Sequence, residues 1–258
     1  ILENLRFLPG EESNDYDVIK GLAQLADLYV DDAFSCAHRA HASIEGIAKY
    51  LPSAAGRLMA REIDTLSRAL ENPARPLTAV IGGSKISTKL GILENLVTNV
   101  QNLVIGGAMA NTFLLADGLG IGTSLCEPDM VGTVKRIQVK AEEQGCELIL
   151  PSDVVIAPAL EAGIDTRVVG IDEVPADQMI LDLGPKSVAR LTNVFADSKT
   201  VIWNGPLGAF EVSPFNDGTK AAARQVAILT TSGELMSIAG GGDTVAALEA
   251  AGSADDFS

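Results

Sequence analysis

Hydrophobic positions follow two alternating patterns over most of the chain. Short, nearly continuous apolar runs are followed by segments in which apolar residues recur every three or four positions. The first pattern is typical of strands buried on both faces, and the second of amphipathic helices. The strand-like runs are Leu77–Ile81, Asn102–Ile105, Glu147–Leu150, Gln178–Leu181, Thr200–Trp203 and Leu235–Ala239. This alternation predicts an α/β fold with a doubly wound, Rossmann-like parallel sheet and right-handed crossovers.

Two of the predicted helices have a clear apolar face. In Ile86–Val97, apolar residues recur at spacings of four, three and four positions, which places them on one side of a helix. The same spacing occurs in Ala54–Leu70, and Pro73 follows where that helix should end. The proline-containing segment Asn72–Pro76 then separates this helix from the first strand of the predicted sheet.

The first fifty residues hold too few elements for a domain of their own. They contain a strand-like start over residues 1–7, a helix near Asp17–Ala26 and a second strand-like run at Leu28–Asp32. An independent α/β domain needs about 100–150 residues. We therefore expect the last part of an N-terminal domain (1–53), an interdomain hinge helix and linker (54–76) and a complete C-terminal domain (77–258). The natural protein is expected to extend beyond both ends of this chain.

Composition and charge exclude several kinds of partner. The 258 residues include 34 Asp and Glu against 19 Lys and Arg, a formal net charge of −15. Binding to nucleic acids or anionic membranes depends on a positive footprint, so neither is expected, whereas the charge is compatible with a small anionic ligand held by a few local cations. No apolar run approaches the roughly 18 residues of a membrane span. Three widely spaced cysteines without a C-x-x-C pattern favour a reducing, cytoplasmic location over a disulfide framework or a zinc site.

Glycine follows five of the predicted strands. The glycines lie in Gly82-Gly83, Gly106-Gly107, Gly184-Pro185, Gly205-Pro206 and Gly240-Gly241-Gly242. Ligands of open α/β sheets bind outside the carboxyl ends of the strands, where glycine lets backbone N–H groups come close to them. The five strand ends therefore indicate a nucleotide-sized site. For any single pair, the alternative is a glycine that only serves a tight turn.

The segment Gly240–Thr244 carries the most specific of these signals. It leads from a strand into a helix predicted at Val245–Ala251, so its N–H groups and the helix dipole form a site suited to phosphate. Asp243 has two possible roles. It is either the N-cap of the helix or a ligand of Mg²⁺, which takes only one or two protein carboxylates when it is bound with phosphates.

Two lysines follow the first glycine pair. Lys85 and Lys89 are four positions apart at the start of the predicted helix, so both should project from one side of it. Like charges at this spacing oppose each other and the helix dipole, and a bound anion would offset both effects. The alternative is a solvated pair. Neither a Walker A pattern nor G-x-G-x-x-G occurs at these strand ends, which argues against P-loop and dinucleotide-binding proteins.

Both histidines of the chain lie beside an arginine. His38, Arg39 and His41 follow the strand-like run at Leu28–Asp32. A His-x-x-His pair is a weak metal signal without further ligands, whereas two histidines and an arginine in an acidic protein suggest a phosphate or carboxylate site. Arg6 is a candidate second cation.

These motifs together resemble those of the phosphoglycerate kinase family, and they occur in the family's order along the whole chain. The matching segments are Leu2–Phe7, Asp32–Phe34, Ala37–Ser43, Gly82–Lys89, Trp203–Glu211 and Gly240–Thr244. The resemblance implies the reversible glycolytic transfer of the acyl phosphate of 1,3-bisphosphoglycerate to Mg·ADP, which yields 3-phosphoglycerate and ATP. It further implies a monomeric enzyme with Mg²⁺ as cofactor, whose domains close around two small substrates.

The resemblance also implies roles for individual residues. The phosphoglycerate would be bound by Arg6, His38, Arg39 and His41. The phosphoryl group in flight would contact Lys85 and the N–H groups of Gly240, Gly241 and Gly242. The nucleotide would be held by Lys89, Gly184, Asn204, Glu211, Gly241, Gly242, Asp243 and Thr244, with Asp243 on Mg²⁺ and Glu211 on the ribose.

The chain departs from the family pattern at both ends. The family's N-terminal strands, with an arginine that stabilises the transferring phosphoryl group, and its C-terminal Ser-Thr-Gly-Gly-Gly-Ala stretch do not occur in these residues. The alternative hypothesis is therefore a nucleotide-binding fragment of the same enzyme that does not turn over.

Overall fold

The computed structural model describes residues 2–37 and 39–257. The chain forms two compact units, Ile1–Asn72 and Pro73–Ser258. The boundary between them lies within the proline-containing segment Asn72–Pro76.

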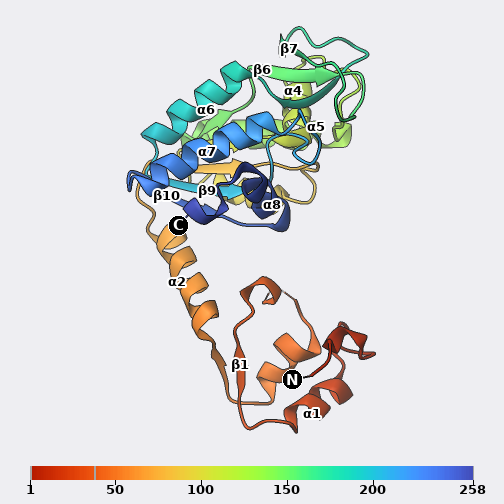
Figure 1. Cartoon of the computed structure of the whole chain (residues 1–258), viewed down its shortest axis with the longest axis vertical. Coiled ribbons are helices and arrows are strands. Elements are labelled where there is room, and N and C mark those ends of the chain that lie inside the picture. Colours follow the sequence, from red (N-terminus) through yellow and green to blue (C-terminus); the bar gives the residue numbers. More distant parts are fainter. Residues whose placement is uncertain (1, 38, 258) are drawn as a thin grey trace. The chain divides into compact units, whose positions relative to one another are not determined.

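The second unit is built on a five-stranded parallel sheet (Figure 1). Its strands, in spatial order, are β10 (Met236–Ala239), β9 (Thr200–Asn204), β3 (Leu77–Ile81), β4 (Asn102–Ile105) and β5 (Glu147–Ile149). All four neighbouring pairs are parallel. The predicted fold class is confirmed, because short, buried apolar runs alternate with helices as such a sheet requires.

Helices cover both faces of this sheet. They are α3 (Leu90–Leu96), α4 (Gly107–Ala116), α5 (Val131–Gln144), α6 (Pro185–Asp197), α7 (Asp217–Thr231) and α8 (Gly242–Ala251). Alternate strand residues enter different cores: Ile81 packs in one cluster with Leu93 and Phe113, whereas Val80 packs in the other with Trp203. Since successive side chains of a strand point to opposite faces, each helix layer has its own apolar core.

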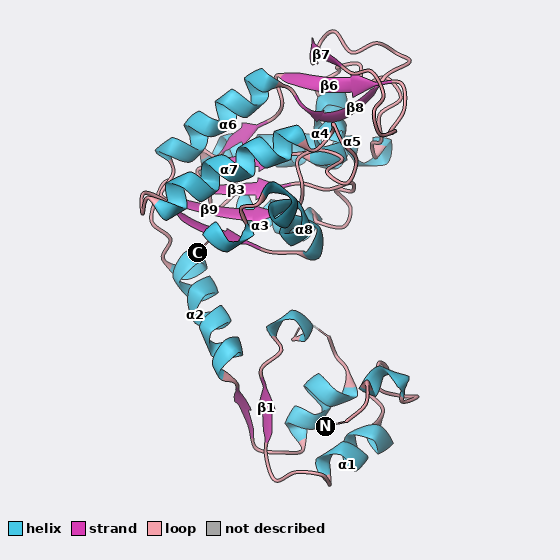
Figure 2. Cartoon of the chain, viewed as in Figure 1, coloured by secondary structure: helices cyan, strands magenta, loops and turns pink. Residues whose placement is uncertain are grey.

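A second sheet, which the sequence analysis did not predict, joins this unit. It is antiparallel, with the order β7 (Arg167–Gly170), β6 (Asp153–Ala157) and β8 (Met179–Leu183). Figure 2 shows β6 and β8 as neighbouring arrows, with β7 beside β6. The assignment of Gln178–Leu181 to the parallel sheet was therefore wrong. Antiparallel strands need only short connections, and no helix intervenes between β6 and β8 to carry a crossover.

The helix predicted at Ile86–Val97 begins later than expected, at Leu90. Ile86 is fully buried as its spacing predicts, but residues 87–89 form a turn. Lys85 and Lys89 therefore do not share a helix face, which corrects the prediction from their spacing. The physical reason is a carboxylate from elsewhere in the chain, described below, that binds the N–H groups at this point.

The first unit holds α1 (Tyr16–Ala23), α2 (Arg57–Glu71) and a parallel strand pair, β1 (Tyr29–Asp31) and β2 (Ser53–Ala55). Short turns of 3₁₀ or π helix occupy Leu5–Phe7, Phe34–Cys36, Ala42–Gly46 and Ile47–Lys49. Two further 3₁₀ turns, at Pro128–Met130 and Ala254–Asp256, belong to the second unit. No helix in the described part of the chain is long and apolar enough to cross a membrane.

The strand predicted over residues 1–7 was wrong. Leu5–Phe7 is a 3₁₀ turn, and the Asn4 side chain accepts a hydrogen bond from the N–H of Arg6. A local side-chain acceptor of this kind competes with strand pairing. Ala54 and Ala55 were expected to open the following helix but belong to β2, which pairs with β1, so that α2 starts only after Gly56.

Candidate functional site

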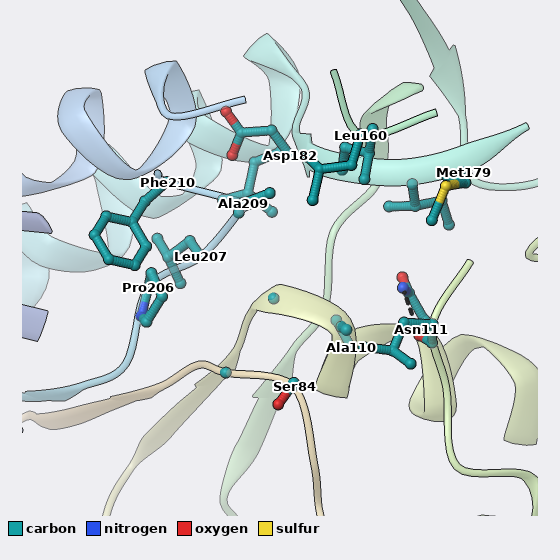
Figure 3. Close-up of a pocket in the computed structure, with 18 of the residues that line it drawn as sticks. Ser84, Ala110, Asn111, Leu160, Met179, Asp182, Pro206, Leu207, Ala209 and Phe210 are labelled. Carbon is teal, nitrogen blue, oxygen red and sulfur yellow. Dashed lines mark hydrogen bonds between the residues drawn. The ribbon is translucent and has the colours of Figure 1, made fainter. Parts of the chain in front are cut away.

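A cavity of about 290 Å³ lies at the carboxyl ends of the strands in the second unit. Figure 3 shows Pro206, Leu207 and Phe210 on one side of it, with Ser84 and Ala110 across from them. Met179 and Leu181 of β8 add further apolar surface, and Gly83 and Gly107 expose bare backbone. Glu211 and Asp243 are the charged residues at its exposed rim. An apolar cavity with a polar rim suits a ring system that carries a polar extension.

The glycines at the strand ends differ in what surrounds them. A Cβ added to Gly82 would lie 1.9 Å from the Pro206 carbonyl oxygen, so this glycine is needed for two backbones to pack together. A Cβ on Gly240 or Gly242 would meet nothing within 4 Å. Packing therefore does not explain these two glycines, and their open side leaves the backbone accessible to a ligand.

Helix α8 begins directly beside the cavity. Its N-cap is Gly241, at φ +98°, and Asp243 lies in the first turn with an exposed side chain. Asp243 is therefore not the N-cap, which removes one of its two possible roles. No side chain caps this end of the helix. The first N–H groups of a helix lack intrahelical acceptors, so this end can bind an anion.

Thr244 fixes the position of this helix start. Its Oγ1 accepts a hydrogen bond from the N–H of Gly205 at 2.6 Å and donates to the Gly240 carbonyl at 2.8 Å. The side chain is buried. Thr244 thus holds the strand ends of β9 and β10 together below the anion-binding end of α8.

Lys89 is bound by the protein itself. Its ammonium donates to the Gly82 carbonyl at 2.7 Å, and to the side-chain and backbone oxygens of Asn204 at 2.6 and 3.3 Å. Asn204 in turn donates from Nδ2 to the Gly240 carbonyl at 2.8 Å. Burial lowers the pKa of Lys89, and the charge of Asp243 offsets this only in part. The chain of bonds links the ends of β3, β9 and β10.

Lys85 contrasts with Lys89. It follows the cavity-lining residues Gly83 and Ser84 and is exposed, and its ammonium makes no hydrogen bond or ion pair with a described residue, although its carbonyl accepts the Thr88 hydroxyl at 2.9 Å. Its charge nevertheless acts on Glu127. The Glu127 carboxylate accepts hydrogen bonds from the N–H and the hydroxyl of Ser87, at 3.1 and 2.6 Å. Lys85 therefore has a free ammonium on a loop that another residue holds.

Asp182 is a buried carboxyl in the cavity wall, with 3% of the residue exposed. Oδ2 accepts the N–H of Gly218 at 2.7 Å, at the start of α7, while the buried Oδ1 has no partner among the described residues. Burial raises the pKa of Asp182 to about 7 despite this hydrogen bond, and repulsion from Asp217 adds to the shift. Its carboxylate also lies against the backbone of Gly208. Asp182 thus supports the loop that forms one wall of the cavity.

Gly184 does not line the cavity. It is the N-cap of α6, and a Cβ there would lie 2.3 Å from the carboxyl carbon of Asp153. That carboxylate accepts the N–H groups of Lys186 and Ser187 at 3.0 and 2.7 Å. Glycine at this position leaves room for Asp153 to cap the helix from a neighbouring strand.

The predicted cations of the first unit are only partly placed. His41 lies with Nδ1 4.0 Å from Oε1 of the buried Glu11, which also accepts the N–H of Ser43. Arg39 is half-buried, and its Nε and the Nδ1 of His41 have no hydrogen-bond partner among the described residues. Arg6 is exposed on the Leu5–Phe7 turn, and His38 lies outside the described residues. The Arg39 Nε and the His41 Nδ1 are therefore buried nitrogens without a hydrogen bond among the described residues.

Comparison with known proteins identifies the family of the chain. The family model for phosphoglycerate kinase matches residues 1–258. The chain belongs to the phosphoglycerate kinase family. The resemblance drawn from its motifs is confirmed.

Several members of the phosphoglycerate kinase family align over nearly the whole chain. The phosphoglycerate kinases of Ruegeria sp. (strain TM1040) and Zymomonas mobilis are 59% and 55% identical to it over 258 residues. A solved phosphoglycerate kinase from Coxiella burnetii superposes with a TM-score of 0.90 at 45% identity, covering 99% of this chain and 66% of that one. For the enzyme from Pyrococcus horikoshii the TM-score is 0.81 at 26% identity, with 97% and 64% covered. The chain spans 65% of the length of both curated relatives.

The sequence analysis missed two polar side chains that support the candidate site. Asp182 and Glu127 act on loops that are distant in sequence, so no local motif marks them. The signal available for Asp182 was an acidic residue inside an otherwise apolar strand. Nothing in the sequence around Glu127 distinguishes it. In residues 2–37 and 39–257, no three His, Cys, Asp or Glu side chains form a group that could hold a metal ion by themselves.

Proposed function

We propose that this chain acts in a phosphoglycerate kinase, which transfers the acyl phosphate of 1,3-bisphosphoglycerate reversibly to Mg·ADP in glycolysis. The observation that carries this proposal is the apolar cavity beside the uncapped start of α8, with Asp243 at their junction. An apolar slot next to an anion-binding helix end matches the two halves of a nucleotide.

The nucleotide would occupy the second unit. The adenine ring fits the slot between Leu207 and Ala110, with the Glu211 carboxylate at the rim to accept hydrogen bonds from the ribose hydroxyls. The phosphates would extend toward the N–H groups of Gly240–Gly242, where the open side of the glycines lets them approach. Lys89 would reach the phosphates by exchanging one of its protein acceptors.

Asp243 fits the role of Mg²⁺ ligand. Its carboxylate is exposed in the first turn of α8 and borders the cavity. One carboxylate with phosphate and water oxygens is the usual environment of nucleotide-bound Mg²⁺. The ion, bound with the nucleotide, would neutralise phosphate charge, and Asp243 would fix where the phosphates lie.

Lys85 is the residue best suited to contact the phosphoryl group in flight. Its ammonium makes no hydrogen bond or ion pair with a described residue, so its charge is available to a phosphoryl group. A loose phosphoryl-transfer transition state needs alignment and spread positive charge more than a covalent catalyst. On the phosphoglycerate, Arg39 and His41 have donors to offer, and Arg6 and His38 are proposed beside them. Domain closure through residues 54–76, a monomeric state and a cytoplasmic location stay predictions.

Two measurements test this function. Calorimetry with Mg·ADP should show binding that Asp243→Ala weakens at least tenfold, while Asp197→Ala, an exposed aspartate at the end of α6, leaves it unchanged. A coupled assay of ATP formation should show turnover that Lys85→Ala lowers strongly but leaves measurable. Failure to bind Mg·ADP would refute the proposal. Binding without turnover would favour the alternative of a non-catalytic nucleotide-binding fragment.

A further inference from the structure

The loop that carries Lys85 makes no helical hydrogen bonds over its first part. Between the end of β3 and Leu90 the chain is not helical, so the N–H groups of Ile86 and Ser87 have no intrahelical acceptors. Ile86 anchors the loop by burying its side chain completely. That contact alone does not set the backbone direction of the neighbouring Lys85, because an apolar contact is not directional.

Glu127 supplies the missing acceptors. Oε2 accepts the N–H of Ser87 at 3.1 Å and Oε1 its hydroxyl at 2.6 Å, across 40 positions of sequence. Burial works to raise the pKa of Glu127, but the hydrogen bonds from Ser87, the nearby N–H of Ile86 and the charge of Lys85 outweigh it, and the net effect is a lowered pKa. The two Ser87 donors, bound by one carboxylate, fix the loop at this point.

Glu127 is itself held in place by helix α4. Its N–H donates to Oγ1 of Thr112 at 3.0 Å, and two residues earlier the Leu125 carbonyl accepts the side-chain amide of Asn111 at 3.0 Å. Thr112 and Asn111 are both buried, with 1% exposed. The position of Glu127 is therefore fixed by buried residues of the unit. Its hydrogen bonds to Ser87 fix the loop in turn.

We propose that Glu127 is a positioning residue for Lys85, which sets the loop backbone so that the free ammonium stays at the mouth of the cavity. This inference rests on the proposed function. Glu127 bonds to the residues after Lys85 and not to Lys85 itself, so it balances the lysine's charge without occupying its donors. A carboxylate that paired with Lys85 directly would compete with the phosphoryl group.

The kinetic test compares Glu127→Gln with Glu127→Asp, Ser87→Ala and a matched control, Glu143→Gln, an exposed glutamate on α5. Because a loop misplaced by about 1 Å can cost about 100-fold in rate, Glu127→Gln should lower kcat roughly 10- to 100-fold. KM for Mg·ADP should stay within about twofold, since the nucleotide is held elsewhere. Glu127→Asp should recover part of the rate, and the control should match the unchanged protein.

Epistasis and hydrogen exchange separate positioning from general stability. If Glu127 acts through Lys85, Glu127→Gln should cost almost nothing further in a Lys85→Ala background. Exchange of the Ile86 and Ser87 amides should be faster in Glu127→Gln than in the Glu143→Gln control. Equal exchange in both, or multiplicative losses in the double variant, would overturn the proposal. The exchange measurement does not depend on turnover. A failure of the proposed function would therefore be recognised separately, because the unchanged protein would then show no phosphoryl transfer.

Discussion

Two loops of the second unit share one sequence signature and differ in structure. Gly82–Lys89 follows β3, and Gly240–Thr244 follows β10. After β10, helix α8 begins at once, at Gly242. A Cβ added to Gly240 or Gly242 in this loop would meet nothing within 4 Å. After β3 the helix is delayed to Leu90, and Gly82 packs against Pro206.

The difference shows that glycine at a strand end has two separate uses. In the loop after β10 it leaves a helix end free for an anion. In the loop after β3 it lets two backbones touch, and the residue proposed to contact the phosphoryl group is Lys85, further along the loop. The same pattern of residues therefore predicts a site but not which atoms of the loop serve it.

The largest effect should come from filling the packed loop. In Gly82→Ala the new methyl group would lie 1.9 Å from the Pro206 oxygen and 2.8 Å from the Gly205 oxygen, both backbone atoms. We expect a loss of roughly 3 kcal/mol or more in the free energy of unfolding, because neither strand end can move alone. Urea unfolding measures this, and a loss below about 1 kcal/mol would contradict the packing role.

A second test concerns Asp182, whose carboxylate lies against the backbone of Gly208, two residues after Pro206. Its folded-state pKa of about 7 lies above the ordinary value of 3.8, so the folded protein binds the proton more tightly than the unfolded chain. Stability should therefore be greatest below pH 4 for this group and fall as pH rises toward 7. Between pH 5 and pH 8 the contribution amounts to roughly 2 to 3 kcal/mol.

Asp182→Asn should remove this pH dependence, because the amide cannot ionise. The measurement is the free energy of unfolding at pH 5 and pH 8, in this variant, in the unchanged protein and in Asp197→Asn as the control. A slope that persists in Asp182→Asn would show that other groups cause it.

The sequence predicted best where burial is uniform. The strands Leu77–Ile81 and Asn102–Ile105 have the predicted bounds, because the interior strands of a parallel sheet are apolar throughout. The partly exposed strand β7, over Arg167–Gly170, carries no such signal. The predicted start of α3 was wrong because the carboxylate that accepts the Ser87 N–H belongs to Glu127, 40 positions away in the sequence. Contacts of that kind arise from tertiary structure and cannot be inferred from local spacing.

The same distinction between local patterns and distant contacts applies to the candidate site. Gly240–Thr244 was found from its local order of residues, since a strand, glycines and a helix start are all neighbours in sequence. Asp182 and Glu127 bind N–H groups 36 and 40 positions away, and only the folded chain shows those pairs.

The open loop should respond in the opposite sense to the packed one. In Gly240→Ala the added methyl group meets nothing within 4 Å, so the free energy of unfolding should change by less than about 1 kcal/mol. Affinity for Mg·ADP should fall about tenfold, equal to about 1.4 kcal/mol, because the methyl group projects where the phosphates would approach. Calorimetry with urea unfolding decides this. A large stability loss with unchanged affinity would reverse the distinction between the loops.

The smallest effect should come from the ionisation of Glu127. Of the two loops compared, the one after β3 is held by this distant carboxylate. Its folded-state pKa lies below the ordinary 4.5, so the stabilisation it gives is present above that value and is lost as pH falls through the folded-state pKa. In an NMR titration from about pH 6 to about pH 3, the Ser87 amide proton should shift upfield as its acceptor is protonated. In Glu127→Gln the Ser87 amide proton should not titrate. A Ser87 shift that survives the substitution would mean that a different acceptor holds the lysine loop.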